Sequence, residues 1–358
     1  YTILGPNDLH GLSFNIVQLP NGKLFELGYV QDSHTVSVSA VEFWSATATS
    51  ISNITGQTML GPAPANIGSV PIIDLLQVGD NPLPHIFLGD GGLDESPWYG
   101  GQIRVLVANA DGQYVDQTSQ LPQQLAFNHR LSTGTINGHA AVAVNMIGNL
   151  VGNPRGVDLL IANPDGTFSD WSSHLPPAIA AMGGPGVYTA SAIADFSGHG
   201  GDIFLGSDQG LTYNTLLVND GTGHFTATKL GIPKPAFADG GGAVVVYALP
   251  TKFAGDSFED LIVGYADSTY EGGNPPNPGA NGSYLQFLQG DGKGGFTDVT
   301  ALHMPSQPIV STAFGKNSWV QKIEQVNTNG LNDLILYASG GTAYLMLNDG
   351  HDVYSMSP

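Results

Sequence analysis

The sequence contains no cysteine, and this absence excludes three kinds of chemistry. The chain can form no disulfide, no thiolate metal site and no cysteine nucleophile. Basic residues are also scarce: 10 Lys and Arg stand against 30 Asp and Glu, which gives a formal net charge of −20. Nucleic acids and anionic membranes both require a basic surface on their partner, so we expect neither as a partner.

Long apolar runs are missing as well. No stretch reaches the roughly 18 residues of a membrane-spanning helix, so we expect no membrane insertion. The chain begins at Tyr1 and shows no signal peptide, which indicates a mature or excised portion of a larger protein. An acidic, lysine-poor chain without cysteine is typical of exported bacterial proteins, and the expected location is therefore extracellular, either secreted or at the cell surface.

Turn-forming residues, by contrast, are abundant. The 358 residues include 49 Gly and 23 Pro, while 41% are hydrophobic and only 11% are charged. Apolar residues are spread evenly along the chain, which argues against disorder. This composition is typical of many short strands joined by tight turns.

Self-similarity organises the chain. Five segments share an apolar strand, a DG turn and an aromatic residue: "LVANADGQY", "LIANPDGTF", "LLVNDGTGHF", "FLQGDGKGGF" and "LMLNDGHDVY". The turn glycines Gly112, Gly166, Gly221, Gly292 and Gly350 are separated by 54, 55, 71 and 58 residues. The long interval contains a 17-residue run of turn formers at 267–283, without which it falls to 54. Asp-Gly tolerates the positive φ of two-residue hairpin turns, so each DG is predicted as such a turn.

A second set of apolar runs lies upstream of the DG turns. These are "HIFLG" (85–89), "DLLIA" (158–162), "DIFLG" (202–206), "DLIVG" (260–264) and "DLILY" (333–337), and each follows another apolar run. Each unit is therefore predicted to contain four short strands, with these runs as second strands. Four strands per unit of about 50 residues are typical of a propeller blade.

The predicted fold is all-β: a single β-propeller domain over residues 1–358 with four-stranded blades. Six blades are favoured, and a seventh is the alternative. The units lie at about residues 10–68, 70–122, 130–176, 187–233, 241–305 and 308–358.

The segments "NDGTGHF", "GDGKGGF" and "NTNGLNDLIL" resemble the FG-GAP/VCBS repeats of bacterial secreted β-propellers, which are related to the integrin α-subunit propeller. The resemblance covers about residues 70–358. It implies the fold but no single function, because such propellers serve as lectins, adhesion modules, protein-interaction domains and parts of polysaccharide lyases. It also implies calcium in the loop between the first two strands of each blade.

The sequence departs from that calcium pattern. In "KFAGDSFED", Lys252 and Ala254 occupy the first two ligand positions, and no unit holds more than two well-placed carboxylates. We therefore expect no calcium or other cofactor, with calcium as the disfavoured alternative. Instead, Asp158, Asp202, Asp260 and Asp333 are expected to accept backbone N–H bonds in their own turns.

Motifs of catalysis are also missing. No GxGxxG, GxSxG, HExxH or Walker motif stands in a credible context, and the ten histidines show no i, i+2 or i, i+4 pairing. We therefore assign no catalytic residue and no metal site.

The long loops point to a binding face. In a propeller, the loops between the second and third strands share one face with the connections between blades. The long connections are 61–69, 123–139, 177–188, 234–242 and 306–318, and the insertions 90–101 and 267–283 fall on the same face. Loops on a rigid scaffold are where binding is concentrated. From these loops we predict Trp98, Tyr99 and Tyr270 as stacking platforms and His129, Arg130, Lys234, Asp239 and Lys316 as polar contacts.

These residues favour an extracellular binding module that recognises carbohydrate or a protein partner through the long-loop face. A polysaccharide-lyase-type enzyme is the first alternative, in which His129, Arg130 and Tyr270 would converge on a uronate. The net charge of −20 opposes such a polyanionic substrate. A structural segment of a larger surface protein, without a ligand of its own, is the second alternative.

Overall fold

A computed structural model describes most of the chain. The described residues are 12–30, 39–47, 49–64, 72–89, 101–122, 127–147, 156–180, 188–207, 214–228, 231–235, 243–253, 257–267, 283–305, 320–327, 331–338 and 343–356. The chain divides into two compact units, each of which is described by itself. Unit 1 comprises residues 1–134, 139–173 and 179–181, and unit 2 comprises residues 135–138, 174–178 and 182–358.

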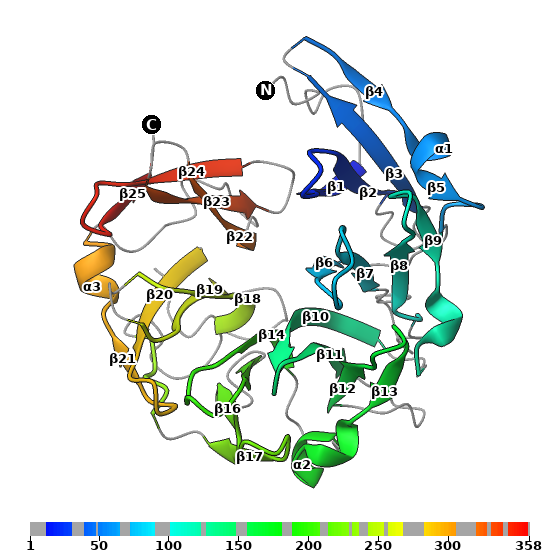
Figure 1. Cartoon of the computed structure of the whole chain (residues 1–358). Helices are drawn as coiled ribbons and strands as arrows, with labels where there is room; N and C mark the ends of the chain where they lie inside the picture. The colour runs from blue at the N-terminus through cyan, green and yellow to red at the C-terminus, as the bar shows by residue number, and fades with distance from the viewer. Residues whose placement is uncertain are drawn as a thin grey trace. The chain divides into compact units, whose positions relative to one another are not determined.

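The described residues of unit 1 form three sheets, antiparallel apart from one short parallel pairing (Figure 1). Blade 1 is β1 (Leu12–Gln18), β2 (Leu24–Val30), β3 (Ser39–Ala46) and β4 (Ile51–Asn53). Blade 2 is β6 (Ile72–Leu76), β7 (His85–Gly89), β8 (Arg104–Ala108) and β9 (Tyr114–Asp116), and the short β5 (Met59–Leu60) pairs in parallel with β9. Blade 3 is β10 (Phe127–Ile136), β11 (His139–Ile147), β12 (Gly156–Ala162) and β13 (Phe168–Asp170), of which only the first hairpin tip falls in unit 2.

Unit 2 contains the other three sheets. Blade 4 is β14 (Tyr188–Ala194), β15 (Asp202–Ser207), β16 (Thr215–Asn219) and β17 (Phe225–Thr228). Blade 5 is β18 (Ala243–Thr251), β19 (Asp260–Asp267), β20 (Ser283–Gly290) and β21 (Phe296–Asp298). Blade 6 is β22 (Val320–Asn327), β23 (Asn332–Ala338), β24 (Ala343–Asn348) and β25 (Tyr354–Met356). Six four-stranded blades in sequence order confirm the predicted all-β propeller.

Helices are few and short in the part of the chain that the structure describes. They are α1 (Thr55–Thr58), α2 (Pro177–Ala180) and α3 (Thr300–His303), with single 3₁₀ turns at Thr118–Gln120 and Ser172–His174. Among the described residues, none of these helices has the length and apolar character needed to cross a membrane.

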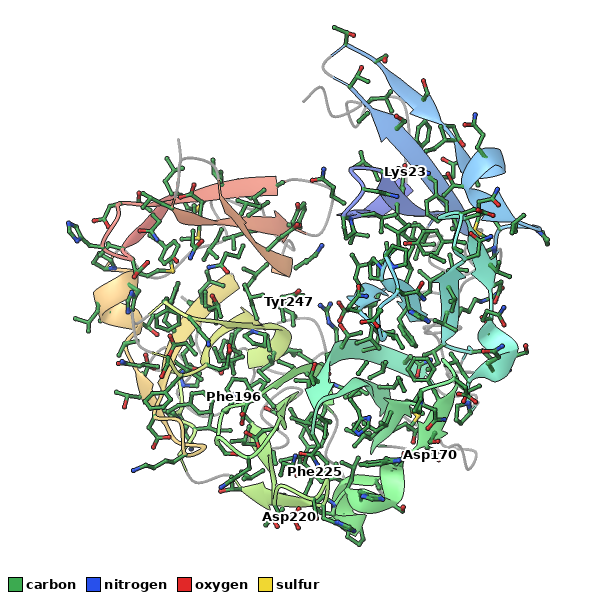
Figure 2. All side chains as sticks on the ribbon, viewed as in Figure 1. Lys23, Asp170, Phe196, Asp220, Phe225 and Tyr247 are labelled. Carbon is green, nitrogen blue, oxygen red and sulfur yellow. The ribbon has the colours of Figure 1, made fainter. Side chains whose placement is uncertain are left out.

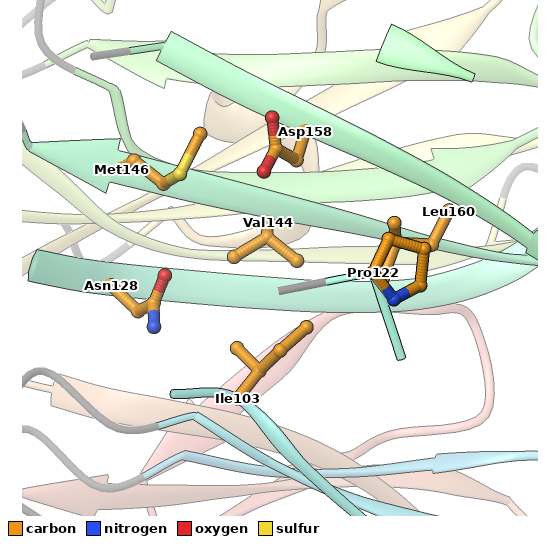
Figure 3. A pocket seen from close by; sticks show the side chains of 7 residues that line it. All are labelled: Ile103, Pro122, Asn128, Val144, Met146, Asp158 and Leu160. Atoms are coloured by element: carbon orange, nitrogen blue, oxygen red, sulfur yellow. The ribbon is translucent and has the colours of Figure 1, made fainter. Parts of the chain in front are cut away.

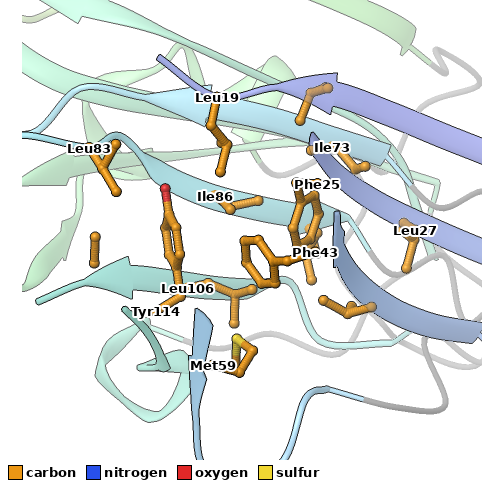
Figure 4. Packing of buried hydrophobic residues seen from close by; sticks show 14 residues of the cluster. Leu19, Phe25, Leu27, Phe43, Met59, Ile73, Leu83, Ile86, Leu106 and Tyr114 are labelled. Atoms are coloured by element: carbon orange, nitrogen blue, oxygen red, sulfur yellow. The ribbon is translucent and has the colours of Figure 1, made fainter. Parts of the chain in front are cut away.

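The core lies between the faces of neighbouring sheets. Strand residues alternate between the two faces of a sheet, so both faces of a blade can be buried against its neighbours. Between blades 1 and 2, Phe43 packs edge-on against Phe25 at 4.9 Å and stacks on Tyr114 at 5.2 Å, measured between ring centroids (Figure 4). The Tyr114 hydroxyl, also buried, donates to the carbonyl of Pro84 at 3.1 Å.

The DG hairpins differ from the prediction in length. All five DG glycines have positive φ, between 67° and 92°. However, the backbone bond that closes each hairpin spans three residues rather than two, as in Asn109 N–H to the Gln113 carbonyl at 2.8 Å. In blade 2 the Asn that begins the turn stabilises this longer loop, because Oδ1 of Asn109 accepts the N–H groups of both Asp111 and Gln113. In blades 4, 5 and 6 the first residue is an Asp, and Oδ1 of Asp220, Asp291 and Asp349 accepts two N–H groups in the same way.

Blade 3 corrects the assignment of two segments. The run "DLLIA" (158–162) lies in β12, the third strand of its blade rather than the second. The segment 123–139, predicted as a connection between blades, contains the whole of β10. This strand was missed because "LSTGTI" is rich in Ser, Thr and Gly and carries no apolar run.

Candidate functional site

Each blade has two chemically different ends. Because the four strands run up and down in order, the turns joining strands one to two and three to four lie at one end, called here the short-turn end. The loops joining strands two to three, and the connections to the next blade, lie at the other, called here the long-loop end.

Buried carboxylates occupy the short-turn end. Asp202 and Asp260 begin the second strands of blades 4 and 5, Asp333 is the second residue of that strand in blade 6, and all three are fully buried. Asp202 accepts the N–H groups of Ser197 at 2.7 Å and Asn219 at 2.9 Å, and so ties its own turn to the adjacent hairpin. Both carboxylate oxygens of Asp202 therefore already accept backbone hydrogen bonds, and a calcium ion would need such oxygens as ligands.

The four aspartates were expected to accept backbone N–H bonds in their own turns, and this expectation holds in part. Asp260 accepts from Phe253 in its own turn, as predicted, and from Gly290 in the hairpin, both at 2.9 Å. Asp333 accepts from Asn348 of the hairpin at 2.8 Å. Asp158 instead accepts the Ser172 hydroxyl at 3.3 Å and lies near the long-loop end of blade 3.

Only part of the predicted binding set falls within the described residues. His129 and Arg130 lie in strand β10, which corrects their placement in a connection. Lys234 is exposed and follows Pro233 at the start of the connection from blade 4 to blade 5. Trp98, Tyr99, Asp239, Tyr270 and Lys316 lie outside the described residues, so their convergence stays a prediction.

A buried polar network lies at the long-loop end of blades 4 and 5. The Tyr265 hydroxyl accepts from Nδ2 of Asn214 and donates to Oε1 of Gln286, both at 2.8 Å. Nε2 of Gln286 in turn donates to Asp298 at 2.9 Å and to the Pro233 carbonyl at 3.2 Å. Burial raises the pKa of Tyr265, so its hydroxyl keeps its proton. The network therefore fixes the backbone next to Lys234.

The first strands of unit 2 share an irregularity near the long-loop end. In β14, β18 and β22 the register with the second strand shifts between Tyr188 and Ala190, between Val245 and Tyr247, and between Val320 and Lys322. Bulges re-aim side chains and are frequent beside active sites. The pairs after the shift are Ala190 with Gly206, Tyr247 with Gly264, and Lys322 with Tyr337. Blade 6 thus carries a cation and a phenol where blade 4 carries only small residues.

Lys322, Glu324 and Tyr337 form a charged cluster there, called the blade-6 cluster below. Nζ of Lys322 lies 3.4 Å from Oε2 of Glu324, and the Tyr337 hydroxyl donates to the same oxygen at 3.0 Å. Nζ also lies 5.4 Å from the centre of the Tyr337 ring, within range of a cation–π interaction. The Lys322 and Glu324 side chains remain 19% and 37% exposed, so both are partly accessible to solvent.

Electrostatics keep the Tyr337 hydroxyl protonated. Burial, the charge of Glu324 and the hydrogen bond to it raise the pKa of Tyr337, and Tyr247 of β18 contributes in the same direction. Tyr247 lies on the first strand of blade 5, where Figure 2 labels it. The arrangement therefore offers a fixed hydroxyl, a carboxylate and an ammonium beside a second tyrosine.

Asp158 lies beside a small cavity at the long-loop end of blades 2 and 3 (Figure 3). The cavity encloses about 10 Å³, enough for one water molecule, and its lining residues are Ile103, Pro122, Asn128, Val144, Met146, Asp158 and Leu160. Burial and the nearby Asp170 raise the pKa of Asp158 to about 6, against a hydrogen bond from Ser172 that lowers it. A cavity of this size holds no sugar ring.

Comparison with known proteins shows likeness at the level of fold. No protein-family model and no curated protein matches the sequence. A sialidase from Trypanosoma rangeli, in complex with 2,3-difluorosialic acid, matches with a TM-score of 0.50 and 12% identity over 97% of this chain and 54% of the sialidase. An exo-β-1,3-galactanase from Clostridium thermocellum matches with a TM-score of 0.41 and 10% identity over 97% of this chain and 81% of the galactanase.

The chain is a six-bladed β-propeller. It spans about half the length of the sialidases that it matches. At such low identity the likeness extends to the fold and to nothing more specific.

The blade-6 cluster was missed by sequence reasoning. Lys322 and Glu324 lie in the run "WVQKIEQV", which was interpreted only as an apolar first strand, and Tyr337 ends the run "DLILY". The signal was present in the spacing: residues two apart in a strand lie on one face. A cation and an anion at that spacing in a first strand mark blade 6 as different from blade 4, whose first strand is "TASAIA".

Proposed function

We propose that this propeller is an extracellular module that binds carbohydrate through its long-loop end. The observation that carries the proposal is the difference between the two ends. At the short-turn end, the buried carboxylates of Asp202, Asp260 and Asp333 are occupied by backbone N–H groups. At the long-loop end, the partly exposed blade-6 cluster presents donors, an acceptor and an aromatic ring. Sugars bind through this combination of hydrogen bonds and aromatic contact.

The same proposal includes an extracellular location and FG-GAP/VCBS-type repeats, and one feature of the chain supports each. A cysteine-free, acidic chain suits a secreted or surface protein. The hairpins support FG-GAP/VCBS-type repeats, because Oδ1 of Asn219 accepts from both Gly221 and Gly223. Asn348 accepts in the same way from Gly350 and Asp352, so the Asn of the motif has a repeated structural role.

A glycan array tests the proposal. The protein is applied to an array of neutral and acidic glycans, and in parallel it is incubated with pectin, ulvan and alginate while absorbance at 235 nm is followed. Binding without a rise in absorbance supports the module. A rise in absorbance reports new unsaturated uronate and would replace the module with a lyase. No binding on the array and no rise in absorbance would contradict carbohydrate as the ligand and leave a protein partner or a structural role.

A further inference from the structure

The blade-6 cluster has hydrogen-bonding capacity that its internal contacts do not use. Both contacts to Glu324 end on Oε2, and Oε1 has no partner within the described part of the chain. The ammonium of Lys322 has three N–H donors, and one of them makes a hydrogen bond to a described residue. The Tyr337 hydroxyl donates a hydrogen bond to Glu324, and its oxygen keeps lone pairs that can accept hydrogen bonds.

This capacity matches hydroxyl groups. A hydroxyl donates one hydrogen bond and accepts others, so two neighbouring hydroxyls can donate to a carboxylate oxygen while accepting from an ammonium. The groups are held in place because Lys322 and Glu324 share a face of β22, and Tyr337 is the register partner of Lys322 on β23. Such preorganisation lowers the entropy that binding costs.

The charge of the cluster selects against anionic sugars. The single ammonium is already paired with the Glu324 carboxylate at 3.4 Å, so the cluster carries no net positive charge. The whole chain carries −20. A uronate or another sugar acid would place its carboxylate beside that of Glu324, which is unfavourable. An uncharged sugar meets no such repulsion.

We infer that Lys322, Glu324 and Tyr337 bind an uncharged sugar through two neighbouring hydroxyl groups. The inference rests on the proposed carbohydrate-binding function and adds the class of sugar and the residues that contact it.

Calorimetric titration of variants tests the inference. The ligands are neutral cello-, xylo- and manno-hexaose and, separately, oligogalacturonate. Lys322→Met is expected to weaken neutral binding about tenfold or more, as for loss of a hydrogen bond to a charged group. Tyr337→Phe is expected to weaken it about threefold to tenfold, as for loss of a hydrogen bond between neutral groups. Glu324→Gln is expected to weaken neutral binding and to strengthen oligogalacturonate binding, because Lys322 is then left without its anion. If the residues had a purely structural role, Glu324→Gln would not change the affinities for the two ligands in opposite directions.

The matched control is the ion pair of Lys252 and Glu259, 3.3 Å apart at the short-turn end of blade 5. Lys252→Met removes a cation of the same type at the short-turn end and is expected to leave both affinities within about twofold of those of the unmodified protein. Preference of the unmodified protein for oligogalacturonate, or neutral binding unchanged in all three cluster variants, overturns the inference and leaves carbohydrate binding standing. Failure to bind any of these ligands, with no hit on the glycan array, overturns the inference and the proposed function together.

Discussion

The backbone N–H of Gly290 donates a hydrogen bond of 2.9 Å to Oδ1 of Asp260, thirty residues earlier in the chain. The second oxygen of Asp260 accepts from Phe253 at the same distance. One buried carboxylate thus joins the two turns at the short-turn end of blade 5, and Asp202 does the same in blade 4. This relationship separates a structural end of the blade from the end that we propose binds ligand.

Asp260→Asn is expected to destabilise the protein by about 2–4 kcal/mol, because an amide NH₂ would then face a buried backbone N–H and leave it unsatisfied. Urea unfolding followed by circular dichroism measures the change. Asp111→Asn is the control: Asp111 is exposed, and the substitution is expected to stay within about 0.5 kcal/mol of the unmodified protein. Equal effects of the two substitutions would contradict a joining role for Asp260.

EDTA is expected to leave the melting temperature unchanged. The oxygens of Asp202 and Asp260 already accept backbone N–H groups, so a calcium ion would have to displace those bonds. Differential scanning calorimetry with and without the chelator makes the measurement. A fall of several degrees, reversed by added calcium, would show that one of these turns is a metal site after all.

Gly201→Ala is expected to cost about 3–5 kcal/mol, because a Cβ would overlap the carbonyl oxygen of Thr135 in addition to adopting a left-handed backbone. Gly201 has φ 108° and lies against the first hairpin of blade 3. Gly138→Ala isolates the backbone cost, since Gly138 has φ 78° and open space around it. Its substitution is expected to cost about 1–2 kcal/mol. Equal losses would mean that the close approach of the two turns does not matter.

Asp158→Asn is expected to stabilise the protein at neutral pH. The folded-state pKa of Asp158 is about 6, above its ordinary value of 3.8. Below about pH 3.5 the carboxyl is mostly protonated in both states and contributes little difference. As pH rises to about 6, the unfolded chain releases the proton first, so the unmodified protein loses stability. Above that, the variant should be more stable by about 1–3 kcal/mol.

The measurement is urea unfolding of both proteins at pH 3.5 and pH 7.5. The variant's advantage should be present at pH 7.5 and disappear at pH 3.5. An advantage of the same size at both pH values would assign the gain to packing in the small cavity and not to ionisation.

The sequence predicted four-stranded blades and favoured six over seven because the blade signals are local, and the structure shows six. Every DG turn requires positive φ at its glycine, and the repeat period follows from these turns alone. Blade 3 was assigned in the wrong frame because a buried second strand and a buried third strand have the same apolar pattern. Only the order of pairing in the sheet distinguishes them. β12 pairs with β11 on one side and with the last strand, β13, on the other, which makes it the third strand.

The candidate site was harder to predict than the fold. Arg130 was assigned to a loop because its strand is polar, and the strand is revealed only by its pairing in the sheet. Lys322 and Tyr337 are fifteen residues apart and meet through the antiparallel register, which a one-residue shift changes. A register shift cannot be located from an apolar run, so the convergence of these side chains required the structure.

Hydrogen–deuterium exchange tests the central claim most directly, because it reports where a sugar contacts the chain. Exchange of the unmodified protein is compared with and without the neutral hexaose that binds most tightly in the calorimetric panel. The account predicts slower exchange at the long-loop ends of β22 and β23, near Lys322 and Tyr337, and no change at 195–202 or 252–260. Protection at those short turns, with none near Lys322, would contradict it.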